Sequence, residues 1–208
     1  MRQVLSDQLS DFAAIYDENV EIVSVKRAQA KECEVLSKRL IKSRQVPELR
    51  WIQPIDDPDA SVRALPTRID GDVRSAILAQ IIEASELLGE LIECDRVGIR
   101  LETLNAPMCP RFHVDQIPCR MLITLRGVGT EWIPNPDVDW NVFDDLDSEE
   151  LPAQTDRQIQ RLSTGNWSLL KGGGWQDHFR GVVHRSPHNV GERLLLALDP
   201  LVEPAEVN

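Results

Sequence analysis

A histidine and an aspartate stand two residues apart in the segment 109–115, which reads CPRFHVD. Residues i and i+2 of a β-strand point to the same face, so His113 and Asp115 would project side by side. His184, expected on a later strand, adds a second imidazole, and two histidines with one carboxylate can cover one face of an octahedral metal ion. The spacing predicts a metal site with up to three open positions. The alternative is a strand histidine that is hydrogen-bonded to its neighbouring carboxylate.

Arg193 opens the leucine-rich segment 193–198, nine positions after His184. The leucines predict a buried strand, and a buried guanidinium needs an anionic partner. A ligand carboxylate would meet that need because it accepts two parallel hydrogen bonds from the planar group. A structural ion pair with Glu131 or Glu192 is the alternative.

The order HxD, distal histidine, arginine resembles the pattern of the Fe(II)/2-oxoglutarate-dependent dioxygenases, which are built on a double-stranded β-helix. The resemblance implies that His113, Asp115 and His184 hold Fe(II), and that Arg193 binds the distal carboxylate of 2-oxoglutarate. The cosubstrate would chelate the metal through two of its open positions, and oxygen would take the third.

A closer resemblance extends over about residues 15–200. The segments 109–115, 126–132, 184–187 and 191–193 are similar to a bacterial family of domains of unknown function. That resemblance implies no established activity. Members of the family are often encoded near zinc-homeostasis genes, which keeps zinc as the alternative metal.

Five further residues near these motifs are weaker candidates for the site. Thr124 and Arg126 are expected to contact the cosubstrate, while Arg185, Trp132 and Cys109 are expected at the rim of the site. Which of them face the metal depends on strand parity.

Composition narrows the classes of partner. The 208 residues carry a net charge of −11, which disfavours binding to nucleic acid or to an anionic membrane surface. The start of the chain lacks the basic and apolar segments of a signal peptide, and the longest aliphatic run, 194–198, is too short to span a bilayer. The four cysteines form no CxxC pair. We therefore expect a cytoplasmic protein with reduced thiols.

Helical patterns dominate the first half. Apolar residues recur every three or four positions in 70–93, and 28–43 is also amphipathic. A short helix is expected at 4–15 and a strand at 20–26, while 47–66 is expected to be a proline-spotted connector.

The second half contains short apolar runs separated by proline and glycine turns, which favours a sandwich or barrel. The expected strands are 97–104, 111–115, 121–126, 167–171, 181–184 and 193–198. With the resemblance above, we predict an α+β, mainly β fold. A double-stranded β-helix core of the jelly-roll or cupin-like type would occupy 95–208, and an N-terminal helical region, 1–94, would pack on one sheet to give one compact domain.

Seven acidic residues and no basic residue lie between Asp137 and Glu150. So many uncompensated carboxylates are expected at the surface, because their burial is costly. The segment is expected to loop over the barrel mouth, where Trp132 and Trp140 would shape a pocket.

Three functions follow from these observations. The preferred one is a dioxygenase that uses Fe(II) and 2-oxoglutarate on an unidentified substrate, either a small molecule or a protein. A non-catalytic metal-binding or zinc-homeostasis protein with the same three ligands is the alternative, and the third is a cupin-like scaffold without metal. The first requires Arg193 to face the metal across a gap of carboxylate size; the second does not.

Overall fold

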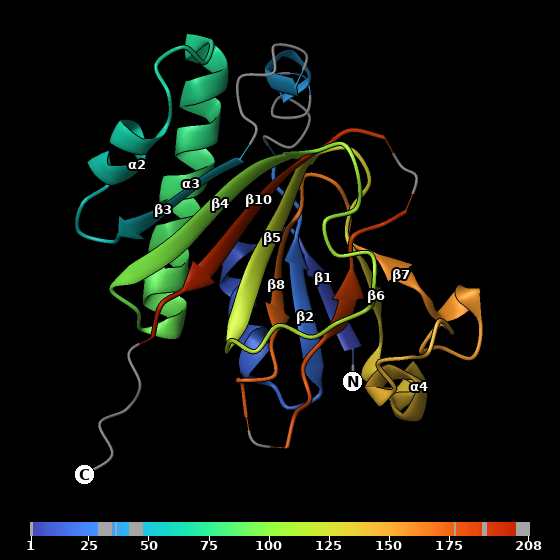
Figure 1. Cartoon of the computed structure of the whole chain (residues 1–208). Helices are drawn as coiled ribbons and strands as arrows, with labels where there is room; N and C mark the ends of the chain where they lie inside the picture. The colour runs from blue at the N-terminus through green and yellow to red at the C-terminus, as the bar shows by residue number, and fades with distance from the viewer. Residues whose placement is uncertain are drawn as a thin grey trace.

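Seven strands form the larger of two β-sheets in the structure, a computed structural model that describes residues 2–28, 35, 37–41, 48–176, 178–188 and 191–202. The strand order is β1-β2-β8-β5-β10-β4-β3 (Figure 1). β1 and β2 pair in parallel, and the other neighbours in this sheet pair antiparallel. The strands are β1 (Arg2–Ser6), β2 (Val20–Val25), β3 (Glu48–Pro54), β4 (Arg96–Leu104), β5 (Cys119–Arg126), β8 (Trp167–Lys171) and β10 (Arg193–Pro200).

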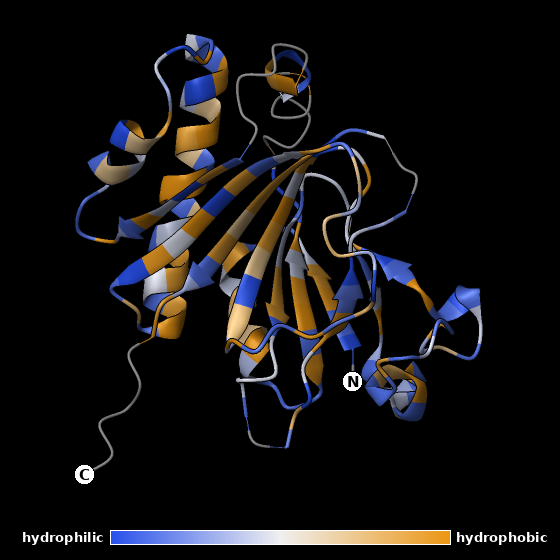
Figure 2. Cartoon of the chain, in the orientation of Figure 1, coloured by the Kyte–Doolittle hydropathy of each residue, from blue (hydrophilic) through white to orange (hydrophobic). Residues whose placement is uncertain are grey.

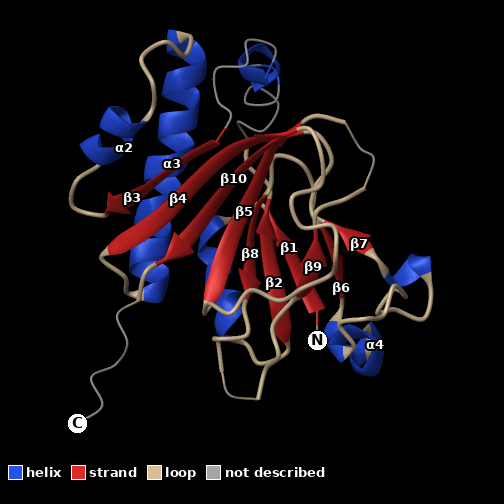
Figure 3. Ribbon diagram, in the orientation of Figure 1, coloured by secondary structure: helices blue, strands red, loops and turns tan. Residues whose placement is uncertain are grey.

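A smaller sheet of three short strands contributes the second layer of the β core (Figure 3). β6 (Glu131–Ile133) lies between β7 (Gln160–Arg161) and β9 (Val183–Arg185). Buried side chains from both sheets meet in an interior cluster. Its members are Ile22, Leu122, Trp132, Leu162, Leu170, Phe179, Val182, Leu195 and Ala197.

Side chains of the central strands alternate between this interior cluster and a larger hydrophobic core. On β10, Leu194, Leu196 and Leu198 belong to the larger core, whereas Leu195 and Ala197 belong to the interior cluster. This period of two is the geometry of a strand buried on both faces. Apolar residues therefore run along the middle of the large sheet (Figure 2).

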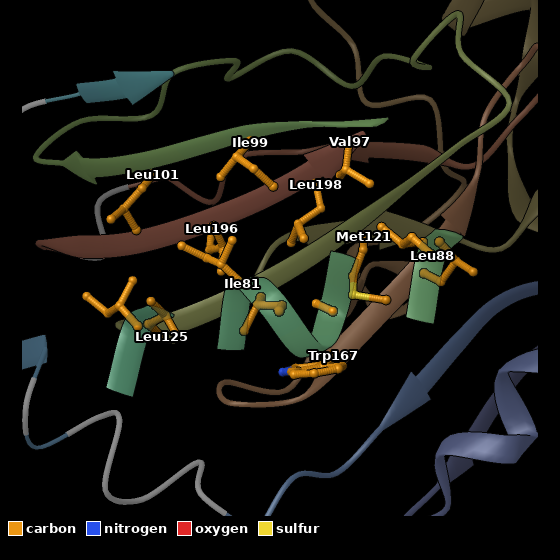
Figure 4. Packing of buried hydrophobic residues seen from close by; sticks show 14 of the residues in the cluster. Ile81, Leu88, Val97, Ile99, Leu101, Met121, Leu125, Trp167, Leu196 and Leu198 are labelled. Atoms are coloured by element: carbon orange, nitrogen blue, oxygen red, sulfur yellow. The ribbon is translucent and has the colours of Figure 1, made fainter. Parts of the chain in front are cut away.

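The helix α3 (Gly71–Ile92) packs on the face of the large sheet opposite the interior cluster. The side chain of Asp70 caps its start by accepting a hydrogen bond from the backbone N–H of Asp72. Ile81 and Leu88 lie one above the other along the helix and point toward the sheet (Figure 4). Burying two such side chains contributes roughly 3–6 kcal/mol to the free energy of unfolding.

The remaining helices are short. They are α2 (Asp59–Ala64), α4 (Trp140–Asp144) and three 3-10 helices, Leu9–Tyr16, Asn135–Asp137 and Asp156–Gln158. None of the helices in the described part of the chain has the length and apolar character needed to cross a membrane.

Several sequence predictions are confirmed by these elements. The helix expected at 70–93 is α3, and the strand expected at 20–26 is β2. The runs at 97–104, 121–126 and 193–198 are β4, β5 and β10.

Others correspond to shorter elements or lie partly outside the described residues. The run at 167–171 is β8. Of the strand expected at 181–184, only residues 183 and 184 are extended, as the start of β9. Of the amphipathic helix predicted at 28–43, residues 35 and 37–41 are described, and these are helical.

Three local predictions are wrong. The helix expected at 4–15 is replaced by β1 and a 3-10 helix, because pairing with β2 outweighs the helical propensity of this segment. The expected connector at 47–66 contains β3 and α2. The strand was missed because the prolines in this segment are typical of turns and outweighed the alternating pattern of side chains in β3. The expected strand at 111–115 is reduced to one isolated bridge, between His113 and His184.

The acidic segment covers the outer face of the small sheet. Ile133 and Val183 point outward and pack against Val138, Trp140 and Phe143 of this segment. Its carboxylates are exposed or half-exposed, as expected. The expected pocket between Trp132 and Trp140 is not formed, because Trp132 lies in the interior cluster and Trp140 on the opposite face of the sheet.

Candidate metal centre

Three potential metal ligands meet beside the small sheet. His113, Asp115 and His184 each offer one ligand atom, and these atoms all lie within 4.8 Å of one another. Nε2 of His184 is 3.3 Å from Oδ2 of Asp115, and Nε2 of His113 is 4.0 Å from Oδ1 of the same carboxylate. The structure thus brings together the three residues that the spacing singled out.

Reciprocal backbone hydrogen bonds hold the two histidines side by side. The N–H of His113 donates to the carbonyl of His184 at 3.0 Å, and the N–H of His184 donates back at 2.9 Å. Asp115 follows two positions after His113 in the loop before β5. A glycine is required where this loop meets the end of β8, because a Cβ at Gly172 would lie 2.0 Å from the carbonyl oxygen of Ile117 and 2.8 Å from that of Asp115.

Each imidazole is oriented by the backbone carbonyl two residues before it. Nδ1 of His113 is 3.0 Å from the carbonyl oxygen of Arg111, and Nδ1 of His184 is 3.0 Å from that of Val182. A carbonyl only accepts, so in the neutral ring Nδ1 carries the proton and Nε2 keeps a lone pair, as a metal ligand requires. Burial, and then the nearby His184, lower the pKa of His113 and favour its neutral form.

Arg120, which was not predicted from the sequence as a site residue, fixes the carboxylate of Asp115. Nη1 of Arg120 donates to Oδ2 of Asp115 at 2.7 Å. The same guanidinium makes two hydrogen bonds to Asp199, at 2.6 and 2.7 Å. Burial alone would raise the pKa of Asp115, but the hydrogen bond and charge that His184 supplies in its protonated form, together with the charge of Arg120, outweigh it and lower this pKa to about 2. The carboxylate is therefore ionised and fixed at neutral pH.

Arg193 lies on β10 and is only 3% exposed. Its Nη2 donates to Oγ1 of Thr130 at 3.3 Å, while its Nε has no hydrogen-bond partner within the described residues. Burial lowers its pKa to about 10, and the charge of Glu131 opposes this shift only in part. The ion pair with Glu131 considered above is not formed, because Glu131 binds Arg161 and Arg185 at 2.7 and 2.8 Å.

Two of the weaker candidates are buried on the interior side. Thr124 lies opposite Leu195 in the β5–β10 pairing, so it shares the face of the interior cluster. Trp132 lies directly opposite His184 in the β6–β9 pairing. Arg126 is half-buried at the end of β5.

The other two candidates lie elsewhere. Arg185 points to the opposite face of β9 from His184, where it pairs with Glu131 and stacks 4.2 Å from the ring centre of Phe112. Cys109 is exposed, and its carbonyl accepts a hydrogen bond from the N–H of Ser186.

The cluster of His113, Asp115 and His184 reaches solvent on the side of His113. The side chain of His113 is 34% exposed, compared with 17% for Asp115 and 7% for His184. A cleft of about 510 Å³ borders His113, and its walls include Gln116, Phe143 and Arg180. A larger molecule could therefore approach the centre from this side.

A comparison with known protein families identifies the family of this chain. The family model of the DUF1826 proteins, described as proteins of unknown function, matches residues 6–199. The chain belongs to the DUF1826 family. The comparison of this DUF1826 chain with curated proteins gave no match.

Solved structures of two dioxygenases and a prolyl hydroxylase share the fold of this DUF1826 chain. The dioxygenase for auxin oxidation from rice has a TM-score of 0.57 at 13% identity, over 100% of this chain and 87% of the rice chain. Dioxygenase for auxin oxidation 1 from Arabidopsis thaliana, in a binary complex with 2-oxoglutarate, has a TM-score of 0.55 at 11% identity, over 98% and 93%. A prolyl-4-hydroxylase from Pseudomonas putida has a TM-score of 0.51 at 9% identity, over 95% and 96%. The double-stranded β-helix prediction is thereby supported.

Proposed function

We propose that this chain is an Fe(II)- and 2-oxoglutarate-dependent dioxygenase. The observation that carries the proposal is the buried guanidinium of Arg193, which has no carboxylate partner in the described structure and lies in the same β core as a triad of two histidines and one aspartate. The fold shared with a dioxygenase solved in complex with 2-oxoglutarate supports it.

The triad fits a ferrous ion by its donor chemistry. In the neutral form of each histidine Nε2 keeps a lone pair, and the carboxylate of Asp115 is ionised. Among the described residues, the cluster of possible ligands holds only these three. Three protein ligands on one face leave positions for exogenous ligands, whereas structural zinc sites have four protein ligands as a rule.

The chemistry of the interior residues suits a dicarboxylate. Leu122, Leu195 and Ala197, from two neighbouring strands of the large sheet, form an apolar floor, and Arg193 is a buried cation on the same strand as Leu195 and Ala197. A cosubstrate carboxylate would give the guanidinium the partner that the protein does not, at a site where little water competes.

The ion, when bound, supplies the activation of oxygen coupled to oxidation of 2-oxoglutarate. The protein residues fix the metal ligands and orient the cosubstrate. Arg120 fixes the carboxylate of Asp115, and the backbone carbonyls of Arg111 and Val182 fix the rings of His113 and His184, so that these three residues would hold the metal. Arg193 sets the direction of the cosubstrate, and the apolar floor excludes water from the reacting end.

Anaerobic calorimetric titration of the Fe(II)-loaded protein with 2-oxoglutarate tests the proposal. We expect the wild type to bind, and Arg193→Leu to lose about 2–5 kcal/mol of binding free energy while it keeps its metal. Arg161→Leu is the matched control, since this arginine is exposed and pairs with Glu131 on the outer face. Retained metal with no 2-oxoglutarate binding by the wild type at millimolar concentration would refute the dioxygenase function and favour a metal-binding protein.

A further inference from the structure

The indole of Trp132 is completely enclosed, yet its N–H is not hydrogen-bonded. Trp132 is 1% exposed, and its Nε1 has no partner within the described residues. Buried indole N–H groups usually find an acceptor, because an unpaired donor in an apolar setting is costly. Two other tryptophans of this chain follow that rule: Nε1 of Trp167 donates to Gln80 at 2.6 Å, and Nε1 of Trp51 donates to Ser61 at 3.0 Å.

Trp132 lies between the metal ligands and Arg193. In the small sheet it is directly opposite His184. Thr130 precedes it by two positions, and Thr130 accepts the hydrogen bond from Nη2 of Arg193. Because residues i and i+2 of an extended chain share a face, Trp132 sits on the path that leads from His184 to the guanidinium.

Two buried donors are thus left unpaired along one path. They are Nε1 of Trp132 and Nε of Arg193. Leu122, Leu195 and Ala197 belong to the same interior cluster as Trp132, and their side chains offer no acceptor. A ligand that satisfies both donors must be rich in acceptor oxygens, carry negative charge and be long enough to extend from the metal to the arginine.

We infer that the indole N–H of Trp132 is a binding donor for the 2-oxo dicarboxylate, acting with Arg193 inside the barrel. The inference rests on the proposed function and deepens it. Trp132 supplies a neutral, rigid donor between two charged anchors, the metal and the guanidinium. Such a donor adds direction without adding charge, and it holds the ligand against the apolar floor.

The test uses the Zn(II)-loaded protein labelled with 15N in its tryptophan indoles, since zinc is diamagnetic. The five tryptophans give five indole N–H signals, and Trp132→Phe identifies the signal of Trp132 by its loss. On titration with 2-oxoglutarate, the Trp132 signal should move downfield as its N–H gains an acceptor. The Trp167 signal, whose N–H is already bound to Gln80 on the opposite face of the sheet, should stay.

Calorimetry of the Fe(II)-loaded variants gives a second readout. Trp132→Phe keeps an aromatic ring but removes the donor, and it should weaken 2-oxoglutarate binding roughly tenfold or more, the usual effect of losing a hydrogen bond to a charged group. Trp167→Phe should leave this affinity unchanged. If Trp132→Phe does not fold, Phe variants of the other four tryptophans assign the signal in the folded protein by elimination.

The outcomes separate the two claims. Equal affinity of wild type and Trp132→Phe, with an unmoved Trp132 signal on saturation, would overturn the role of Trp132 and leave the proposed function standing. No binding of 2-oxoglutarate by the wild type would overturn the proposed function itself, and this inference with it.

Discussion

Replacing Arg193 by methionine should make the ligand-free protein more stable. The guanidinium is 3% exposed, and burial lowers its pKa from 12.5 to about 10. Since one pKa unit corresponds to about 1.4 kcal/mol, the folded state carries a penalty of about 3 kcal/mol for keeping this group charged at neutral pH. Methionine removes the penalty and fills much of the same space.

The gain is reduced by what the substitution removes. The hydrogen bond from Nη2 to Thr130 is long, at 3.3 Å, and is worth about 1 kcal/mol or less. The free energy of unfolding should therefore rise by about 1–2 kcal/mol. Residues kept for a ligand commonly reduce the stability of the empty protein in this way.

Urea denaturation of chelator-treated protein measures this effect. Arg185→Met is the matched control, because Arg185 has both an acidic partner, Glu131, and an aromatic ring, Phe112, beneath it. We expect that variant to lose about 1–3 kcal/mol. If Arg193→Met lost as much as Arg185→Met, the guanidinium would be a structural group, and the reasoning that it awaits a ligand would be refuted.

Three further predictions follow. Asp115→Asn should weaken Fe(II) binding, measured by equilibrium dialysis, by more than the 10- to 100-fold that is typical when a residue supporting a metal ligand is lost. The control Asp145→Asn, on the exposed acidic segment, should bind Fe(II) as the wild type does. Because burial lowers the pKa of His113 from 6.5, this ring should be mostly neutral at pH 6.5 in the metal-free protein. An NMR titration in which the His113 ring protonates above pH 7 would contradict the shift. Trp140→Ala should lower the melting temperature and leave metal binding unchanged, since Trp140 packs on the outer face against Phe143 and Arg180. A loss of metal affinity with unchanged stability would instead place Trp140 at the metal site.

The candidate ligands could be predicted from the sequence because their evidence is local. His113 and Asp115 are separated by one residue, and an extended backbone at the single bridge of His113 suffices to keep them together. Arg193 stood out because a charged residue at the start of a leucine-rich strand is unusual. The partner of Asp115 could not be found in this way. Arg120 and Asp199 are 79 positions apart, and only the register of β5 against β10 makes them neighbours.

The fold was predictable where a periodic pattern was long. The 22-residue helix α3 shows its apolar stripe along its whole length. The short strands β1 and β3 form because neighbouring strands complete their hydrogen bonds, and no pattern within five to seven residues shows which neighbour will be present. The acidic segment was expected at the surface from its charge, but its apolar residues Val138 and Phe143 determine which surface it covers.

A crystal structure of the protein loaded anaerobically with Fe(II), recorded at the iron absorption edge, tests the central claim most directly. We predict one iron position bound by Nε2 of His113, Nε2 of His184 and a carboxylate oxygen of Asp115 at roughly 2.0–2.2 Å, with the remaining positions free of protein side chains. Iron bound elsewhere, or a fourth side chain that closes the site, would contradict the account.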